Sequence, residues 1–266
     1  MWAVVERGTF RLMLLILGVV FAFLYVPISV LVGLSFNEGG LPTAWTGFST
    51  KWYSALWQNS DILRAAGNTL FVALISTVLA TVLGTLLAVG VELRRRNGKW
   101  LETVIFAPMI IPDIVLAIAL LSFFSLLGVQ MGLHTIIMAH VVFNLAFVCA
   151  VVRARLKGFD WSIVEASVDL GASMATTLRR VVLPVLAPAI MAGALLAFTL
   201  SVDEFIIAFF TAGAGRASIT LPMQIFAMIR FGVTPEINAL ATLVMAVSVV
   251  ALALSQRLNK GGLPGQ

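Results

Sequence analysis

The sequence predicts an all-α integral membrane protein with six transmembrane helices and both termini on the cytoplasmic side. Apolar residues make up 61% of the 266 residues and charged residues only 11%, whereas an average soluble domain holds roughly 25% charged residues. Uncharged stretches long enough to cross a bilayer recur along the chain, and the basic residues gather in alternate connections. These observations exclude an ordinary soluble protein.

The uncharged stretches supply six segments near the length of about 20 residues that a helix needs to span a bilayer core. The first could be a signal peptide, but its apolar run is longer than usual and no A-x-A cleavage site closes it. Residues 103–152 hold one charge, Asp113, and a turn at residues 128–132 divides them into two spans. We expect a single transmembrane domain over residues 1–266, with spans at 12–36, 66–91, 104–127, 133–152, 188–211 and 237–256.

The basic residues set the orientation of these spans. With the N-terminus inside, the outer connections hold only Lys51, Arg64, Arg216 and Arg230 of the 17 Lys and Arg, as the positive-inside rule requires. Residues 212–236, which glycines and prolines interrupt, are expected to form a structured outer connection, and a re-entrant path stays open. The remaining basic residues are inside: Arg7, Arg11, Arg94, Arg95, Arg96, Lys99, Arg153, Arg155, Lys157, Arg179, Arg180, Arg257 and Lys260.

Small residues recur at every fourth position in two of the spans. Such stripes let helix backbones approach closely in lipid. We expect contacts within one subunit, with a subunit interface along one stripe as the alternative. The stripes are Ser76, Ala80, Gly84 and Ala88 in one span, and Ala189, Gly193, Ala197 and Ser201 in the other.

No metal site is expected. The one cysteine, Cys149, excludes a cysteine-rich site. His134 and His140 are six residues apart, which does not suit one metal-binding helix face, so both are interpreted as packing or interface residues.

The inner loop at residues 153–184 is much longer than a bundle turn needs. Ser162 and Glu165 have the spacing of a capping box, which predicts the start of a short helix. This helix is expected to end at Gly171, where glycine permits a sharp turn.

A second short helix is expected after this turn, with Ser173 as its cap and Pro184 as its end. Two short helices presented to the cytoplasm suit the docking of a soluble partner. The alternative is that these amphipathic helices lie on the bundle or on the lipid surface.

The sequence of this loop, EASVDLGASMATTLRRVVLP, resembles the EAA signature of type I ABC-importer permeases. Ser167 stands where a second alanine is usual, and Val181 stands where isoleucine is common. The segments GFSTKWYSALWQN, SVDEFIIAFFTAG and LPMQIFAMIRFGVTPEINALAT are similar to those of the second permease subunit of spermidine/putrescine importers. The matching positions of the signature are Glu165, Ala166, Gly171, Leu183 and Pro184.

The resemblance implies the MetI-like type I ABC permease fold in the bacterial inner membrane. It further implies a complex with a second permease, a cytoplasmic ATPase dimer and a periplasmic substrate-binding protein. No nucleic acid is expected as a partner, because the excess of basic residues lies in the inner connections and sets the orientation. The chain shows no P-loop pattern, so we expect it to be no enzyme and to bind no cofactor, with ATP and Mg²⁺ held by the partner ATPase. The residues implied to couple to the ATPase are Glu165, Ala166, Ser167, Asp169, Gly171 and Ala172.

Three acidic residues in apolar segments are candidates for a polyamine path: Asp113, Asp203 and Glu204. A charge within the membrane is costly and usually faces a partner or a watery path. The alternatives are that Asp203 or Glu204 pairs with Arg216 or Arg230, and that Asp113 caps amides freed beside Pro112.

Two further functions stay open at this point: an ABC permease for another small solute, and a stand-alone secondary transporter. The aromatic residues of the outer segment are expected at the membrane interface, with docking of the binding protein as the alternative. They are Trp45, Trp52, Tyr53 and Trp57.

Overall fold

The structure is a computed structural model that describes residues 7–40, 44–93, 98–230 and 232–260. The chain divides into two compact units: unit 1 comprises Met1–Leu63 and Ile225–Gln266, and unit 2 comprises Arg64–Gln224. Throughout the described ranges the regular secondary structure is helical, and one isolated antiparallel bridge joins Asn37 to Phe48. The expected inner basic run of Arg94, Arg95 and Arg96 lies outside the described residues.

Unit 1 contains α1 (Arg7–Leu34), α2 (Lys51–Gln58) and α12 (Pro235–Lys260). The buried Asn37 organises the connection between α1 and α2. Its Nδ2 donates a hydrogen bond to the carbonyl of Ala44 at 2.8 Å, and its Oδ1 accepts one from the amide of Thr46 at 2.9 Å. A buried asparagine thereby satisfies backbone groups that have no ladder or helix partner.

Two of the four outer aromatic residues form hydrogen bonds to the connection between α1 and α2. Trp52 donates its Nε1 hydrogen to the carbonyl of Asn37 at 2.8 Å, and the hydroxyl of Tyr53 lies 2.7 Å from Ser35 Oγ. These two rings therefore hold the connection together. Trp45 and Trp57 are exposed, and their position at a membrane interface stays a prediction.

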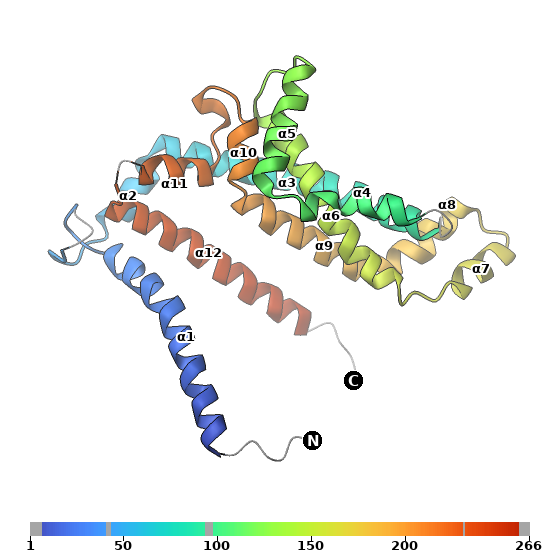
Figure 1. Ribbon diagram of the computed structural model, residues 1–266, viewed down its shortest axis with the longest axis horizontal. Coiled ribbons are helices and arrows are strands. Elements are labelled where there is room, and N and C mark those ends of the chain that lie inside the picture. The colour runs from blue at the N-terminus through green and yellow to red at the C-terminus, as the bar shows by residue number, and fades with distance from the viewer. Residues whose placement is uncertain (1–6, 41–43, 94–97, 231, 261–266) are drawn as a thin grey trace. The chain divides into compact units, whose positions relative to one another are not determined.

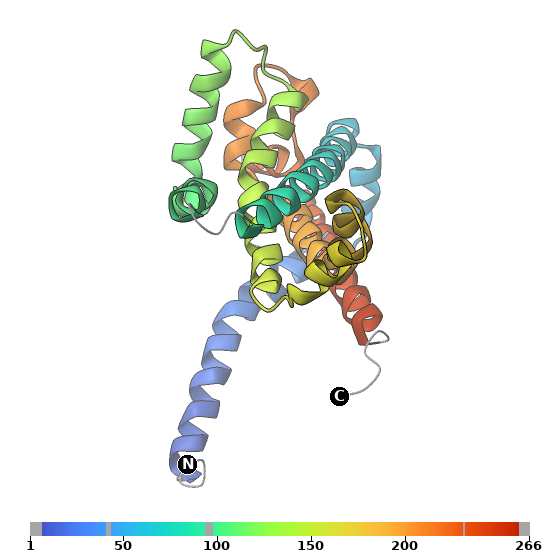
Figure 2. The ribbon, with the colours of Figure 1, turned by 90° about the vertical axis from the view of Figure 1, so that its right-hand side faces the viewer.

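Unit 2 is built around α6, and its helices appear in Figures 1 and 2. A π-helical turn at Leu178–Val182 joins α8 to α9, and a 3₁₀ turn lies at Arg216–Ser218. Unit 2 also takes in the first residues of α11 (Leu221–Ile229) and α3 from Arg64 onward. Its helices are α3 (Ser60–Leu93), α4 (Gly98–Ile110), α5 (Asp113–Leu126), α6 (Leu133–Leu156), α7 (Ser162–Asp169), α8 (Met174–Thr177), α9 (Leu183–Asp203) and α10 (Ile206–Thr211).

Four described helices are long and apolar enough to cross a membrane, or five if the bent pair α4 and α5 counts as one span. These two helices meet at 106°, and Figure 2 shows α4 nearly end-on beside α5. The break falls at Ile111 and Pro112, because proline removes a helix hydrogen bond and disfavours helical geometry in the residue before it. The chain is thus a multi-pass membrane protein, and the count of six spans stays a prediction.

Two sequence expectations about the fifth span are wrong. Pro184 does not end the helix, because an apolar helix continues from Met174 to Asp203. The π-helical turn just before Pro184 widens the backbone where its ring would otherwise meet the preceding turn. The helix expected to run to residue 211 instead breaks at Glu204, where the backbone is extended, and resumes as α10.

The connection after α10 is structured within unit 2, as expected. Asn68 of α3 donates hydrogen bonds to the carbonyls of Ala217 and Ile219, at 2.8 and 2.9 Å. Thr69 Oγ1 accepts a hydrogen bond from the amide of Leu221 at 2.7 Å. Adjacent polar residues on α3 therefore satisfy the irregular backbone that leads into α11.

The small-residue stripes lie inside unit 2, against α6. A Cβ on Gly84 would lie 2.9 Å from Val148 Cβ, and a Cβ on Gly193 would lie 3.4 Å from Val148 Cγ1. Beyond this contact, Ser201 Oγ lies 3.0 Å from Ser76 Oγ and 2.7 Å from His140 Nδ1. The expectation of contacts within one subunit is therefore confirmed for these positions, and His140 is a packing residue.

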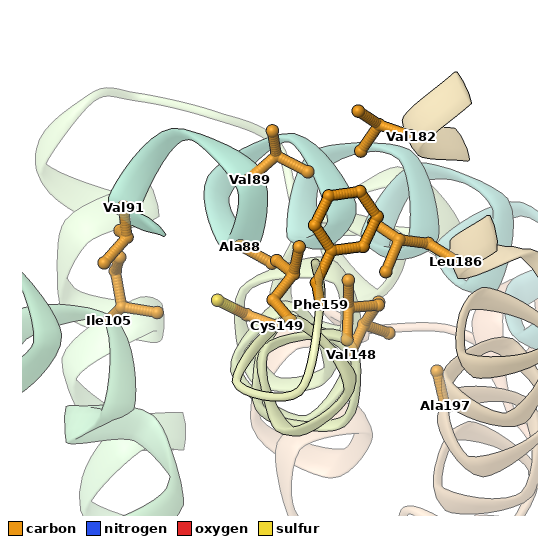
Figure 3. Close-up of a cluster of buried hydrophobic side chains, with 12 residues drawn as sticks. Ala88, Val89, Val91, Ile105, Val148, Cys149, Phe159, Val182, Leu186 and Ala197 are labelled. Carbon is orange, nitrogen blue, oxygen red and sulfur yellow. The ribbon is translucent and has the colours of Figure 1, made fainter. Parts of the chain in front are cut away.

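A buried hydrophobic cluster continues the same packing toward the end of α6 (Figure 3). It joins side chains of α3, α4, α6 and α9 with Phe159, which follows α6. The cluster connects the bundle to the start of the 153–184 loop. Its buried members are Ala88, Val89, Val91, Ile105, Val148, Cys149, Val152, Leu156, Phe159, Val182, Leu186 and Ala197.

We expect Gly84→Ala to destabilise the protein, because the new methyl group would lie only 2.9 Å from Val148 Cβ and 3.0 Å from the carbonyl oxygen of Leu145. Overpacking of this kind costs about 1–3 kcal/mol. Thermal unfolding of the purified protein in detergent should show a lower midpoint.

Gly90→Ala is the matched control on the same helix, because a Cβ there meets nothing within 4 Å. Its midpoint should equal or exceed that of the wild type, since alanine favours a helix by up to about 1 kcal/mol over glycine. A Gly84→Ala protein as stable as the wild type would contradict the close packing of α3 on α6.

Candidate functional site

The loop between α6 and α9 is an ordered pair of short helices. Gly171 ends α7 with φ +83°, in the left-handed region that glycine adopts freely. Its amide donates to the carbonyl of Val168 at 2.8 Å, and the amide of Ala172 donates to the carbonyl of Ser167 at 3.1 Å. This pair of hydrogen bonds is a Schellman motif, so the predicted turn at Gly171 is confirmed.

The predicted capping box at Ser162 is wrong. Ser162 lies inside α7, and its amide donates to Asp160 Oδ1 at 3.0 Å. Hydrogen bonds from the side chain and the backbone of Ser162 lower the pKa of this exposed carboxyl. The aspartate two residues earlier therefore satisfies the first turn of the helix. Ser173 does cap α8, as predicted, by accepting from the amide of Thr176 at 3.3 Å.

Side-chain contacts hold the two short helices together and against the rest of unit 2. Ser167 Oγ lies 2.9 Å from Oγ1 of the buried Thr177, which ties α7 to α8. Phe159 packs edge-to-face against Trp161, with ring centroids 5.0 Å apart. Trp161 and Val164 pack in turn against the buried cluster. One side of α7 is thus anchored, and Figure 1 shows the loop beyond the ends of α6 and α9, away from α5 and α10.

The outer side of the loop carries most of the predicted coupling residues. Glu165, Ala166, Asp169 and Gly171 are exposed, whereas Ser167 and Ala172 are half-buried. The sequence-based candidates omitted the exposed apolar side chains of the loop. The most exposed are Leu170, at 89%, and Met174, at 59%, and Ile163 and Val168 are exposed as well.

An ion pair joins the first residue of the 153–184 loop to α4. Arg153 Nη2 lies 2.6 Å from Glu102 Oε1. The Arg153 guanidinium also lies 5.5 Å from the centroid of the Phe106 ring. Sequence reasoning assigned Arg153 only to the inner basic charge, because nothing in its neighbourhood along the chain identifies a partner 51 residues away.

The three acidic candidates lie near one another in unit 2. Asp113 is the first residue of α5, and Asp203 is the last residue of α9. Glu204 interacts electrostatically with both carboxylates. The helix breaks at 111–112 and 204–205 are brought together because α10 packs against α5 through Ile207, Leu116 and Ala117.

The carboxylate of Glu204 also has a structural role. Its Oε1 accepts a hydrogen bond from the amide of Ile207 at 2.9 Å, in the first turn of α10. A carboxylate there satisfies a free amide and complements the helix dipole. The alternative that Asp203 or Glu204 pairs with Arg216 or Arg230 stays a prediction. The start of α5 has no side-chain cap hydrogen bond, so the structure does not support capping there by Asp113.

Comparison with known proteins identifies relatives along almost the whole chain. Residues 80–260 match the family described as binding-protein-dependent transport system inner membrane component. The chain is 42% identical over 247 residues to the spermidine/putrescine transport system permease protein PotC of Escherichia coli K12, covering 92% of this chain and 93% of that protein. It is also 42% identical to the putrescine transport system permease protein PotI of the same strain, covering 92% and 89%.

Solved structures show the same fold. A bacterial ABC transporter that imports the acidic polysaccharide alginate matches with a TM-score of 0.74 at 15% identity, covering 97% of this chain and 98% of that one. The inward-facing MetNI methionine ABC transporter matches with a TM-score of 0.63 at 19% identity, covering 78% and 97%. The expected MetI-like permease fold is therefore confirmed.

The cap of α7 gives a prediction with a defined pH dependence. Because the pKa of Asp160 is lowered in the folded loop, its contribution is present above the ordinary carboxyl pKa and is lost as the pH falls through the lowered value. Hydrogen–deuterium exchange at the start of α7, corrected for the intrinsic rate, should stay slow from neutral pH down to the ordinary carboxyl pKa and rise below it.

Two variants distinguish the effect of the capping hydrogen bond of Asp160 from the effect of its charge. Asp160→Ala should exchange fast at neutral pH, whereas Asp160→Asn, which keeps an acceptor oxygen, should stay closer to the wild type. Equal exchange in the alanine variant and the wild type would show that Asp160 does not hold the first turn.

Proposed function

Because the chain belongs to the family of binding-protein-dependent transport system inner membrane components, we propose that it is a permease subunit of an ATP-driven importer of polyamines. The observation that carries this proposal is the 42% identity to PotC and PotI over 92% of the chain. With a second permease, the chain forms the path for spermidine or putrescine delivered by a periplasmic binding protein.

The proposal places the chain in the bacterial inner membrane, with six spans and both termini in the cytoplasm. The family description and the bias of basic residues toward the inner connections support this topology. The chain contributes no ATPase site of its own, and ATP and Mg²⁺ are bound by a partner ATPase dimer.

In this proposal the α7–α8 loop docks on the ATPase. Support comes from its anchored inner side and its exposed outer side, which together make a rigid projection. The exposed apolar side chains Leu170 and Met174 add area that a partner groove can bury, and buried apolar area is the main favourable term in most association. Glu165 and Asp169 add negative charge to the same surface.

The carboxylates at the two helix breaks form the cation-selective part of the path. Asp113, Asp203 and Glu204 gather negative charge where the backbone is interrupted. Polyamines carry several ammonium groups, which carboxylates bind by charge-assisted hydrogen bonds. Intramembrane acidic residues commonly mark such paths.

An ABC permease for another small solute is the second candidate. The fold is shared with transporters for alginate and for methionine, and a fold alone does not determine function. The family match disfavours a stand-alone secondary transporter, because that family works with a binding protein.

Ala166→Trp tests the docking role. The side chain is exposed on α7, so the variant should fold and insert normally while the new ring prevents the ATPase from seating. We expect substrate-stimulated ATP hydrolysis by the assembled complex to fall about tenfold or more, the size of an interface hot spot.

Ala154→Trp, at another exposed position near the end of α6, is the control and should retain stimulation. Stimulation of the Ala166→Trp complex at the wild-type level would exclude docking through this face of α7.

Asp203→Asn and Glu204→Gln test the path. Glutamine keeps an oxygen that can accept from the Ile207 amide, so the start of α10 is preserved while the charge is removed. ATP-dependent uptake of spermidine or putrescine by the double variant should fall about tenfold, in line with the loss of a desolvated charge contact.

Asp61→Asn removes one carboxylate charge from the first turn of α3 and is the control, which should leave uptake near the wild-type value. Full uptake by the double variant at normal expression would remove both residues from the path.

A further inference from the structure

The ion pair between Arg153 and Glu102 connects the last turn of α6 to the first part of α4. Arg153 Nη2 and Glu102 Oε1 are 2.6 Å apart, and the two side chains are only 12% and 41% exposed. The distance is that of a strong charge-assisted hydrogen bond. Because Arg153 is largely withdrawn from water, the pair is far less screened than an exposed one.

One end of this connection is the docking loop. Arg153 lies one turn before the end of α6 at Leu156, and Phe159 and Trp161 lie three and five residues beyond that end. Val152, Leu156 and Phe159 belong to one buried cluster, against which Trp161 packs. A force on α7 therefore reaches the last turn of α6 through close-packed side chains.

The other end is the group of carboxylates. From Glu102, α4 runs to Ile110, a distance of roughly 12 Å at the helical rise per residue. The chain then bends by 106° and begins α5 at Asp113, which interacts electrostatically with Glu204. Helix α4 is therefore a short segment, with Pro108 inside it, that has the ion pair near one end and the acidic group beyond the other.

Further contacts around the pair join α4 to α6. Ile105 of α4 lies in the same buried cluster as Val152, and the guanidinium of Arg153 lies over the ring of Phe106. Removing Glu102 would leave the largely buried Arg153 guanidinium without this partner, so the pair adds to the contacts that hold the two helices together.

We propose that Glu102 and Arg153 are positioning residues that link the docking loop to the carboxylates at the α4–α5 bend. The inference rests on the proposed importer function and deepens it by naming the connection between its two sites. Movement imposed on α7 changes the position of α4, and with it the position of Asp113 relative to Glu204.

The test uses the complete complex of this chain, its partner permease, the ATPase and the binding protein, reconstituted in lipid. The readout is the ratio of ATP hydrolysis with and without the solute-loaded binding protein, measured beside the thermal midpoint of each variant. The solute is whichever of spermidine, putrescine or an amino-acid panel stimulates the wild-type complex.

Glu102→Arg places two like charges together and should lower this ratio at least about threefold, within the range by which mutations between two coupled sites change their coupling. The reciprocal double variant Glu102→Arg with Arg153→Glu should restore the ratio to within about twofold of the wild type, because a pair of opposite charges is re-formed. Arg155→Gln removes an exposed positive charge from the same end of α6 and should leave the ratio unchanged. If Glu102→Arg does not assemble, Glu102→Gln replaces it, with a smaller fall in the same direction.

A single variant that lowers the thermal midpoint but leaves the ratio unchanged would overturn the link and show that the pair is only structural. Failure of the double variant to recover the ratio while it assembles normally would overturn it as well. By contrast, a wild-type complex that no solute stimulates would contradict the importer function itself, and stimulation by an amino acid alone would contradict only the polyamine substrate.

Discussion

Val148 of α6 lies against Gly84 of α3 and Gly193 of α9, at distances that leave little room for larger residues. Helices in lipid gain little from the hydrophobic effect between them, so such close packing is a main source of their association. The docking loop follows α6, and Asp203 ends α9. The distance between the docking loop and the carboxylates therefore depends on how α3, α6 and α9 pack at Val148.

Features governed by local sequence were predictable. The small residues of α3 and α9 recur at the helical period, so their burial on one face follows from spacing alone. Gly171 and Ser173 act within one turn of their own positions, and the sequence predicted both the turn and the cap. The EAA-like signature identified the loop that the structure shows as a projecting pair of helices.

Features that depend on distant contacts were not predictable. Hydropathy showed an apolar run through Glu204 but not the break there, because the break depends on the packing of α10 against α5. The partner of Arg153 lies on another helix, and the approach of Asp113 to Glu204 requires the bend after α4. At the start of α7, two acceptors close together in the sequence, Ser162 and Asp160, could each cap the helix, and spacing alone favoured the wrong one.

The two helix breaks of unit 2, at 111–112 and 204–205, leave backbone groups that need hydrogen-bond partners from protein or water. The last carbonyls of α4 and α9 have no partners within their own helices, as at any helix end, and Asp113 and Asp203 stand beside them. Within a bilayer, interrupted backbone is stable only where it is buried in protein or faces a water-filled cavity. Breaks at membrane depth would therefore need protein partners or a water-filled cavity, and in such a cavity an ammonium group could exchange its hydration water for fixed oxygens without entering hydrocarbon.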